Sequence, residues 1–412
     1  MADLYCRLAN GYTNTPTLRI TWLESLSNLH TQTKRFAEAA MCNLHIAAMI
    51  SEYLNIVQPT PGLPNGCDSF VQVSPNILEE SSIRDTSIVK GISDGSGVFT
   101  EEKLIKYLTT SIGELKAADL FEIANDVYKL VLPIYEKNFD YELLGNAHME
   151  LNQIFVNIVD CMQSERRMLG SYYRVGFYGK AFEELDTKEF IYKEPKITKL
   201  VEIKDRLKKL YSEKLSTDIE IIVHSNVVNV NELDPKKSYI QLTSVEPYFD
   251  ESELNERKTS FYRKVNIKRF IYVTPFTKTG KARTDSVADQ FIRKTILTTE
   301  RSFPYVRLRL DVSEKKQIEL DPLTHSIEEV KKQSARILLE ANSQNPSLKT
   351  LQPVLSGSVC LQVQAGPLEY SRVFFIERPK EWDSAKLSEL RDTLIQFLEA
   401  CRIGMDKHES LC

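Results

Sequence analysis

The spacing of apolar residues changes twice along this chain of 412 residues, and this limits the folds that it can adopt. Up to about residue 165 the spacing is helical, as in the run Leu120, Ile123 and Val127. From about residue 170 apolar and polar residues alternate, as between Val306 and Val312, which is typical of half-buried strands. Helical spacing returns after Asp321. Because strands and helices do not alternate regularly, this order disfavours a Rossmann fold or a TIM barrel and predicts an α+β fold.

The expected elements can be placed approximately. Helices are expected over residues 18–30, 34–56, 120–134, 143–158, 200–211 and from about 384. Strands are expected over residues 172–178, 218–223, 239–245, 268–273, 293–299 and 306–312. Asp119 and Glu122 have the spacing of a capping box at the start of the helix over 120–134. Residues 58–100 contain four prolines and a glycine-rich run, which predicts an irregular and partly mobile connection.

One helical stretch near the C-terminus is interrupted. Helices expected over residues 347–356 and 367–376 are separated by the apolar segment Gly357–Pro367. Within it, Gly366 permits backbone conformations that other residues resist, and Pro367 suits the first position of a helix. An apolar loop displayed between two helix halves is unfavourable in water unless it contacts something. The alternative is a simple turn whose valines lie in the core.

The composition is that of an ordinary globular chain, with 42% hydrophobic residues, 27% charged residues and a net charge of −4. No run of about 18 apolar residues could span a membrane, and the N-terminus lacks the features of a signal peptide. The seven cysteines are scattered without CxxC spacing, which predicts reduced thiols that mostly fill the core. We therefore expect a cytoplasmic protein of two to three domains.

Residue patterns for covalent, metal or cofactor chemistry are missing from the sequence. The six histidines form no HExxH motif, and Gly280-Lys281 does not complete a Walker A loop. Paired acids such as Glu79-Glu80, Glu101-Glu102 and Glu183-Glu184 are adjacent in sequence, which favours a solvated surface. We therefore expect no metal, no cofactor and no covalent catalysis.

Basic residues concentrate in one segment. Between Arg257 and Arg309 there are 14 Lys or Arg and three acidic residues, a local balance of +11, which leaves −15 for the rest of the chain. Aromatic residues are interleaved with these cations. Such a sheet could bind nucleic acid or phosphoinositide, or it could steer an acidic protein surface into place. Alternating arginines on a strand can also simply form its solvated face.

Several long motifs resemble one known family. They are Asp3–Asn10, Glu38–Cys42, Arg167–Gly179 with Tyr192–Pro195, Arg293–Thr299 with Phe303–Val306, and Gly357–Pro367. Together they resemble the DOCKER domain (the second DOCK homology region) of DOCK-family guanine nucleotide exchange factors, nearest to the zizimin and zir subgroups. The resemblance extends over nearly the whole chain.

The resemblance implies three lobes. These are a helical array over residues 1–165 that forms a homodimer, a central antiparallel β lobe of two sheets over 166–321, and a helical bundle with the interrupted helix over 322–412. It also implies a function, the exchange of GDP for GTP on a Rho-family small GTPase of the Cdc or Rac type, held between the second and third lobes. This activity requires no acid, base or nucleophile. It also implies no nucleic-acid partner, and it implies membrane contact only indirectly, through regions outside this chain.

The resemblance further assigns a nucleotide sensor. This is a valine that enters the GTPase active site, and by its position in the motif it is Val363. The remainder of the sensor segment is Gly357, Ser358, Val359, Gln362, Gln364, Ala365, Gly366 and Pro367. The candidates for GTPase docking on the basic strands are Arg269, Arg293, Lys294, Arg307 and Arg309.

Three features depart from the family pattern. Gln364 stands where many relatives have Asn, and Pro353 lies inside the helix before the sensor segment, where it should remove a hydrogen bond and kink the axis. The chain ends at Cys412, whereas the third lobe of the family usually continues through another long helix, so we expect a truncated lobe. The alternative function is a non-catalytic scaffold of the same fold that binds a GTPase without exchanging its nucleotide.

Overall fold

The structure is a computed structural model that describes residues 1–84, 97–164, 167–195, 197–278, 286–343, 346–359, 366–378 and 382–411. The chain forms two compact units, which are described separately. The first contains Met1–Ile271 and Leu297–Lys315, and the second contains Tyr272–Ile296 and Lys316–Cys412. The three-lobe boundaries expected from the sequence stay a prediction.

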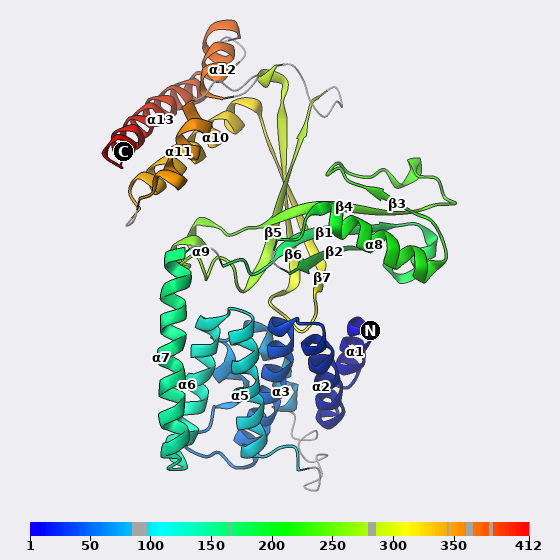
Figure 1. The fold of residues 1–412 in the computed structure, drawn as a ribbon. Helices are drawn as coiled ribbons and strands as arrows, with labels where there is room; N and C mark the ends of the chain where they lie inside the picture. The colour runs from blue at the N-terminus through cyan, green and yellow to red at the C-terminus, as the bar shows by residue number, and fades with distance from the viewer. Residues whose placement is uncertain are drawn as a thin grey trace. The chain divides into compact units, whose positions relative to one another are not determined.

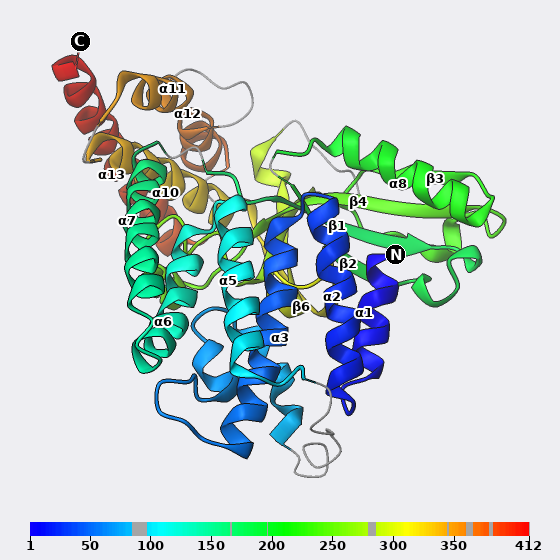
Figure 2. The same cartoon turned by 60° about the horizontal axis from the view of Figure 1, so that its bottom comes forward.

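The first unit begins with an array of helices (Figures 1 and 2). They are α1 (Ala2–Gly11), α2 (Pro16–Gln32), α3 (Phe36–Val57), α5 (Glu101–Ala117), α6 (Phe121–Lys137) and α7 (Tyr141–Ser164). Each helix packs against the next one in this order. All residues of α3 from Glu38 to Tyr53 are buried, because this helix lies in the middle of the array. The four N-terminal helices expected from the apolar spacing are thereby confirmed.

The connection between α3 and α5 differs from the expected irregular loop. It contains two 3₁₀ helices, η1 (Gly66–Phe70) and η2 (Pro75–Arg84), which pack against α3. Cys67, Phe70 and Ile77 from this segment are fully buried. The prolines therefore prevent an α-helix without preventing core packing. Residues 85–96 lie outside the described residues, so the expected mobility there is untested.

The capping box expected at Asp119 and Glu122 is wrong. Helix α6 begins at Phe121, and its N-cap residue, Leu120, has no side-chain cap. Asp119 has a φ of +58°. Glu122 is instead paired with Arg167, whose Nη1 and Nη2 donate to the two carboxylate oxygens at 2.7 and 2.6 Å. A bidentate ion pair with a buried arginine has replaced the local cap.

The middle of the chain forms seven strands. They are β1 (Ser171–Tyr178), β2 (Glu189–Glu194), β3 (Ile219–Ile222), β4 (Ser238–Pro247), β5 (Ile267–Phe276), β6 (Phe291–Phe303) and β7 (Arg309–Leu320). The six expected strands are confirmed, whereas β2 was missed. β7 begins three residues later than expected and continues to Leu320. Its second half was not predicted, because it is exposed and carries no apolar alternation.

The strands join into one sheet in the order β1-β2-β7-β6-β5-β4-β3, and β1 also pairs with β4. The expected two sheets merge because β4 belongs to both. Tyr239–Val245 pair with β1, and Glu246 and Pro247 pair with β5. Strand β1 pairs antiparallel with β2 and with β4, and β2–β7 and β4–β5 are also antiparallel pairs. In contrast, β3 pairs with β4 in parallel.

Further helices belong to the first unit. They are η4 (Lys180–Leu185), α8 (Leu200–Leu215), η5 (Val230–Glu232) and α9 (Glu251–Glu256). The expected amphipathic helix is confirmed as α8, which packs against β3 and β4. Its Tyr211 ring lies 5.0 Å from the ring of Phe177 on β1, in an edge-to-face arrangement. This aromatic cluster fixes α8 on the sheet.

The second unit contains the outer parts of β5, β6 and β7, followed by helices. They are η6 (Val287–Asp289), α10 (Pro322–Ala341), α11 (Leu348–Val359), α12 (Pro367–Ser371), a π-helical turn η7 (Arg372–Glu377) and α13 (Ser384–Leu411). Helix α10 starts as expected, since the Asp321 side chain accepts a hydrogen bond from the Thr324 amide at 2.9 Å. Helices α10, α11 and α13 pack against one another. A Cβ added at Gly404 would lie 2.7 Å from Leu355 Cδ2, so glycine allows this close approach.

Two further observations concern the described residues as a whole. Cys6, Cys42, Cys67, Cys161 and Cys401 are free thiols, and all except Cys161 are buried, as expected. Among the helices of the described ranges, none combines the length and apolar character that a membrane crossing requires.

Candidate functional site

The interrupted helix is the first candidate site. Helix α11 continues through Pro353 to Val359, so Gly357, Ser358 and Val359 belong to its last turn rather than to a loop. The Ser358 hydroxyl donates to the Val354 carbonyl at 2.7 Å, which keeps the side chain on the helix. The sensor candidate Val363, together with Gln362, Gln364 and Ala365, lies outside the described residues.

The second half of the interruption has the predicted backbone. Gly366 has a φ of +102°, a conformation that favours glycine, and Pro367 is the first residue of α12. The helix then passes into the π-helical turn η7, a geometry that is often found at functional sites.

The core of the second unit fixes both ends of this interruption. This core includes Leu351, Val354 and Leu355 of α11. It also includes Tyr370 of α12 and Phe374 of η7. The two helix ends are therefore anchored by packing.

The docking candidates on the basic strands are all within the described residues, and each has an acidic partner. Arg269 pairs with Asp250 at 2.7 Å and with Glu253, Arg293 with Glu319 at 2.8 Å, Lys294 with Glu328, Arg307 with Asp311 at 3.1 Å, and Arg309 with Asp3 at 2.9 Å. A paired cation contributes little to the long-range field, so the balance of +11 overstates the steering potential of this segment. Lys258 and Lys268 are exposed, and no ion pair involves them within the described part of the chain.

Arg309 also holds the sheet together. Its Nη1 donates to the hydroxyls of Tyr192 and Tyr211 at 3.0 and 3.2 Å, and its guanidinium lies 4.8 Å from the centre of the Phe190 ring. Its side chain is only 17% exposed. The alternative of a solvated face is therefore wrong for Arg309, because its side chain packs among aromatic side chains of β2 and α8.

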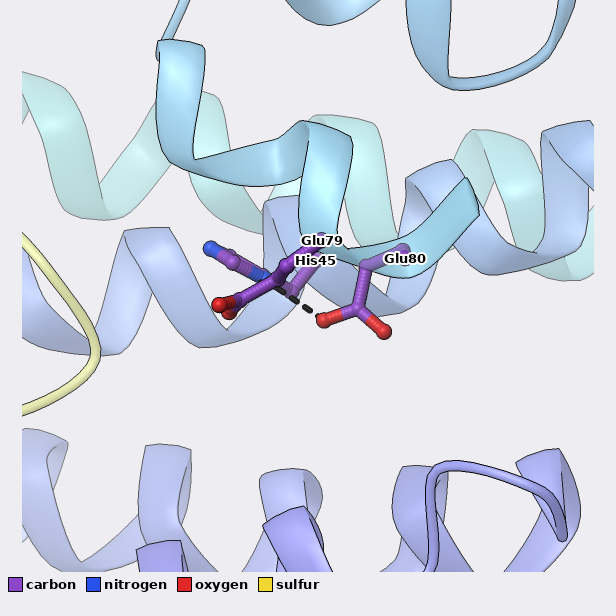
Figure 3. Close-up of side chains that lie close together, drawn as sticks. All are labelled: His45, Glu79 and Glu80. Atoms are coloured by element: carbon purple, nitrogen blue, oxygen red, sulfur yellow. Dashed lines mark hydrogen bonds and ion pairs between the residues drawn. The ribbon is translucent and has the colours of Figure 1, made fainter. Parts of the chain in front are cut away.

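A second constellation was missed by the sequence analysis. Glu79 and Glu80 of η2 were assigned to a solvated surface, but their side chains are only 14% and 1% exposed. Arg19 of α2 donates to the two oxygens of Glu80 at 2.7 and 2.6 Å. In Figure 3, His45 of α3 lies beside both glutamates, with Nδ1 2.8 Å from Glu80 Oε1 and 3.2 Å from Glu79 Oε1. Because carboxylates only accept hydrogen bonds, this ring nitrogen carries the proton.

The second glutamate faces the strands. Arg301 Nε donates to Glu79 at 2.9 Å, and the Tyr305 hydroxyl donates to it at 2.8 Å. An arginine and a histidine placed among apolar helix positions, Arg19 and His45, were the sequence signal that could have revealed this network, since buried charges require partners.

His45, Glu79 and Glu80 are close enough together to hold a metal ion. However, Arg19 and Arg301 already neutralise the two carboxylates. A divalent cation would therefore leave two uncompensated positive charges in a buried site, which is strongly unfavourable. The constellation is better explained as a buried ion-pair network, which we call the Glu79–Glu80 network.

Comparison with known proteins agrees with the order of the elements. Three family models match the chain: "DHR-2, Lobe A" over residues 3–160, "DHR-2, Lobe B" over 225–302 and "DHR-2, Lobe C" over 337–412.

The chain belongs to the DHR-2 family, the DOCKER domains of DOCK-family proteins.

Curated relatives support this assignment. The chain is 41% identical over 413 residues to dedicator of cytokinesis protein 11 of Danio rerio, and 41% identical over 419 residues to dedicator of cytokinesis protein 7 of Homo sapiens. It is 40% identical over 419 residues to dedicator of cytokinesis protein 8 of Mus musculus. Each alignment includes all of this DHR-2 chain but only 19–20% of the relative, so the chain spans about a fifth of their length. The family expected from the motifs is confirmed.

The Glu79–Glu80 network predicts a specific dependence of stability on pH. Burial alone would raise the pKa of the Glu80 carboxyl, but Arg19 and His45 lower it to about 2. Because this pKa is lower in the folded than in the unfolded chain, the stabilisation is complete above about pH 4.5 and is lost as the pH falls towards 2. Urea unfolding should show that Glu80→Gln lowers the free energy of unfolding at pH 7 by about 3–5 kcal/mol. The loss of stability below pH 4.5 should be shallower in this variant.

The matched control is Glu213→Gln on the exposed side of α8, which should leave both the stability at pH 7 and its acid dependence unchanged. If Glu80→Gln loses stability on acidification as steeply as the wild type, Glu80 does not carry this pH dependence.

Proposed function

We propose that this chain accelerates the release of GDP from a Rho-family small GTPase of the Cdc or Rac type. The observation that carries the proposal is that the chain matches all three lobes of the DHR-2 domain and that α11 and α12 are separated at the place where the sensor motif stands. The chemistry of such a reaction belongs to the GTPase and its nucleotide, so the exchange factor acts as a regulator without covalent catalysis.

In this proposal Val363 is the nucleotide sensor. Mg²⁺ requires oxygen ligands in near-octahedral geometry, and it helps to hold GDP. A valine side chain at the metal position offers no ligand and displaces water, so it weakens the binding of metal and nucleotide together. By thermodynamic linkage, a factor that binds the nucleotide-free GTPase best lowers the affinity for nucleotide, and nucleotide lowers the affinity for the factor by the same ratio.

The sensor predicts the outcome of an exchange assay. Release of fluorescent GDP from a panel of Rho-family GTPases should be faster with the wild-type chain than without it. Val363→Ala should lower the acceleration about tenfold, because the smaller side chain loses apolar contacts that contribute about 1–2 kcal/mol of binding free energy. The matched control Val57→Ala, at an exposed position in α3, should leave the rate unchanged.

Each other result has a defined meaning. If no GTPase releases GDP faster with the wild type, exchange is excluded for this chain. Binding of the GTPase without faster release would indicate the non-catalytic scaffold instead.

We also propose that the basic strands dock the GTPase. The candidates Arg269, Arg293, Lys294, Arg307 and Arg309 would then exchange their internal acidic partners for acidic groups of the GTPase. Such an exchange is easiest where both members of the pair reach solvent, as Lys294 and Glu328 do, with side chains 28% and 42% exposed. Surface pairs of this kind contribute little to stability.

The Lys294–Glu328 pair provides a charge test of docking. Lys294→Gln should lower the association rate with the GTPase about threefold at low salt, because one attractive charge is lost. Glu328→Gln should raise the rate by a similar factor, because Lys294 is then unpaired. Stopped-flow association measured over a range of ionic strengths checks both, and a wild-type rate that does not change with salt would count against docking by this surface.

We further propose that the helical array forms a homodimer through α7. The apolar residues that face α6 include Ala147, Leu151 and Ile154. Elsewhere on the same helix, apolar side chains are exposed: Tyr141, Met149, Phe155, Val156, Val159 and Met162. We call these six residues the exposed α7 stripe. So many exposed apolar side chains on the last helix of the array are unusual for a monomer and fit a contact with a second copy.

The exposed α7 stripe predicts that a single charge will disrupt the dimer. Val156→Glu should raise the dimer dissociation constant at least about a hundredfold, because a carboxylate would be buried in an apolar interface. Sedimentation at micromolar concentration checks this result. The control is Val57→Glu, which adds the same charge at an exposed position of α3 and should leave the dimer intact. A wild-type chain that sediments as a monomer would contradict dimerisation.

A further inference from the structure

A loop between α9 and β5 concentrates positive charge in the first unit (Figure 1). We call residues 257–268 the cationic loop; it includes the first two residues of β5. It contains no Asp or Glu and five basic residues: Arg257, Lys258, Arg263, Lys264 and Lys268. Within the described residues, no carboxylate forms an ion pair with any of the five, and Lys258, Arg263 and Lys268 are exposed. The docking candidates on the basic strands, in contrast, all have acidic partners.

The backbone of the cationic loop is held by its own first arginine. Arg257 Nη1 donates to the carbonyl oxygens of Tyr262 and Val265, the latter at 2.7 Å. Its Nη2 donates to the carbonyl oxygen of Asn266 at 3.1 Å. The guanidinium carbon also lies 4.2 Å from the centre of the Phe249 ring. The loop is therefore folded around a guanidinium whose hydrogen bonds go to backbone carbonyls rather than to carboxylates.

Phe261 fixes the loop on neighbouring residues of the first unit. Its side chain is buried, and its ring centre lies 4.7 Å from the guanidinium carbon of Arg167. Lys264 Nζ donates to the Arg167 carbonyl oxygen at 2.9 Å. The next aromatic side chain, Tyr262, is 44% exposed. The loop therefore presents its exposed side chains from a fixed backbone, so little conformational entropy is lost when they bind.

Acidic side chains near the loop reduce its charge only in part. Asp250 and Glu253 already pair with Arg269, the residue that follows the loop. Glu251 and Glu256 of α9 are exposed. With these two acids included, the loop still carries +3, and because the whole chain has a net charge of −4, the remainder carries −7. An anionic surface would therefore attract this part of the first unit and repel the remainder.

We propose that the cationic loop binds an anionic lipid bilayer directly and orients the chain on it. Clusters of about four to eight Lys or Arg attract anionic phospholipid headgroups, and a partly exposed tyrosine such as Tyr262 suits the boundary between water and lipid. The family resemblance implied membrane contact only through regions outside this chain, so a direct contact goes beyond that expectation. The proposal does not depend on the proposed exchange function.

The loop fits a bilayer better than a nucleic acid or an acidic protein. Single-stranded nucleic acids stack their bases on several exposed aromatic rings, but Phe261 and Phe270 are 2% and 0% exposed. Protein interfaces are centred on a well-packed hot spot, whereas the exposed side chains of the loop other than Tyr262 are polar or charged. Lipid headgroups are laterally mobile, so they can gather around cations on a fixed backbone without a complementary pocket.

The test removes three exposed charges and keeps the attachments of Arg257 and Phe261. The loop variant combines three substitutions: Lys258→Gln, Arg263→Gln and Lys268→Gln. The matched control removes the same charge from exposed positions of α8 in the same unit, where acidic residues are interspersed. It also combines three substitutions: Lys208→Gln, Lys209→Gln and Lys214→Gln. Urea unfolding should give the same midpoint for both variants as for the wild type, because all six side chains are exposed.

We expect the wild-type chain to co-sediment with vesicles made of equal parts phosphatidylserine and phosphatidylcholine, but not with vesicles of phosphatidylcholine alone. This binding should weaken as the salt concentration rises, because exposed charges are screened. The loop variant should bind the phosphatidylserine vesicles about a hundredfold more weakly, since three attractive charges near the surface are lost. The α8 control should bind as the wild type does.

Three results would overturn the proposal. The first is a wild-type chain that does not bind the phosphatidylserine vesicles. The second is an equal loss of binding in both variants, because the effect would then follow the net charge of the chain rather than the loop. The third is binding of the wild type to an oligonucleotide or to a polyglutamate peptide but not to the vesicles, which would assign the loop to a nucleic acid or to an acidic protein instead.

Discussion

The Glu79–Glu80 network ties together elements that are far apart in the sequence. Arg19 from α2 and His45 from α3 hold the two carboxylates, and Arg301 and Tyr305 bring the end of β6 to them. Arg19 pairs with Glu80 and Arg301 with Glu79. Removing one carboxylate would leave its arginine partner without its ion pair, which is costly in the interior. The packing of the sheet on the helical array therefore depends on this arrangement.

Charge also explains why the sequence alone gives an incomplete account of the basic strands. The segment between Arg257 and Arg309 has a balance of +11, yet its docking candidates lie beside acids from other parts of the chain, such as Glu319 and Glu328. These acids are distant in the sequence and adjacent in space. In the proposed docking, these strands would offer a set of ion pairs that can exchange partners, which favours specificity over simple attraction.

Much of the fold could be predicted from hydrophobic periodicity, because helices and strands place apolar residues at different intervals. The misses have physical reasons. β2 was missed because Lys193 and Glu194 are buried in ion pairs, so polar residues stand at core positions. The helical segment η2 was missed because prolines obscure a packed core element. The solvated face considered for the alternating arginines fails for Arg309, because a sequence does not reveal the aromatic side chains of β2 and α8 that surround it.

The sequence by itself determined the α-β-α order, the DHR-2 family and the interruption before Gly366, because these depend on local periodicity, on long motifs and on the conformational freedom of glycine. Only the tertiary structure decided which charged residues are buried and with which partner. It placed Glu80 in the core, paired Arg309 with two tyrosines and left several apolar side chains of α7 exposed. Partners in an ion pair are chosen by distance in space, and residues separated by more than two hundred positions, such as Glu79 and Arg301, become neighbours only when the chain has folded.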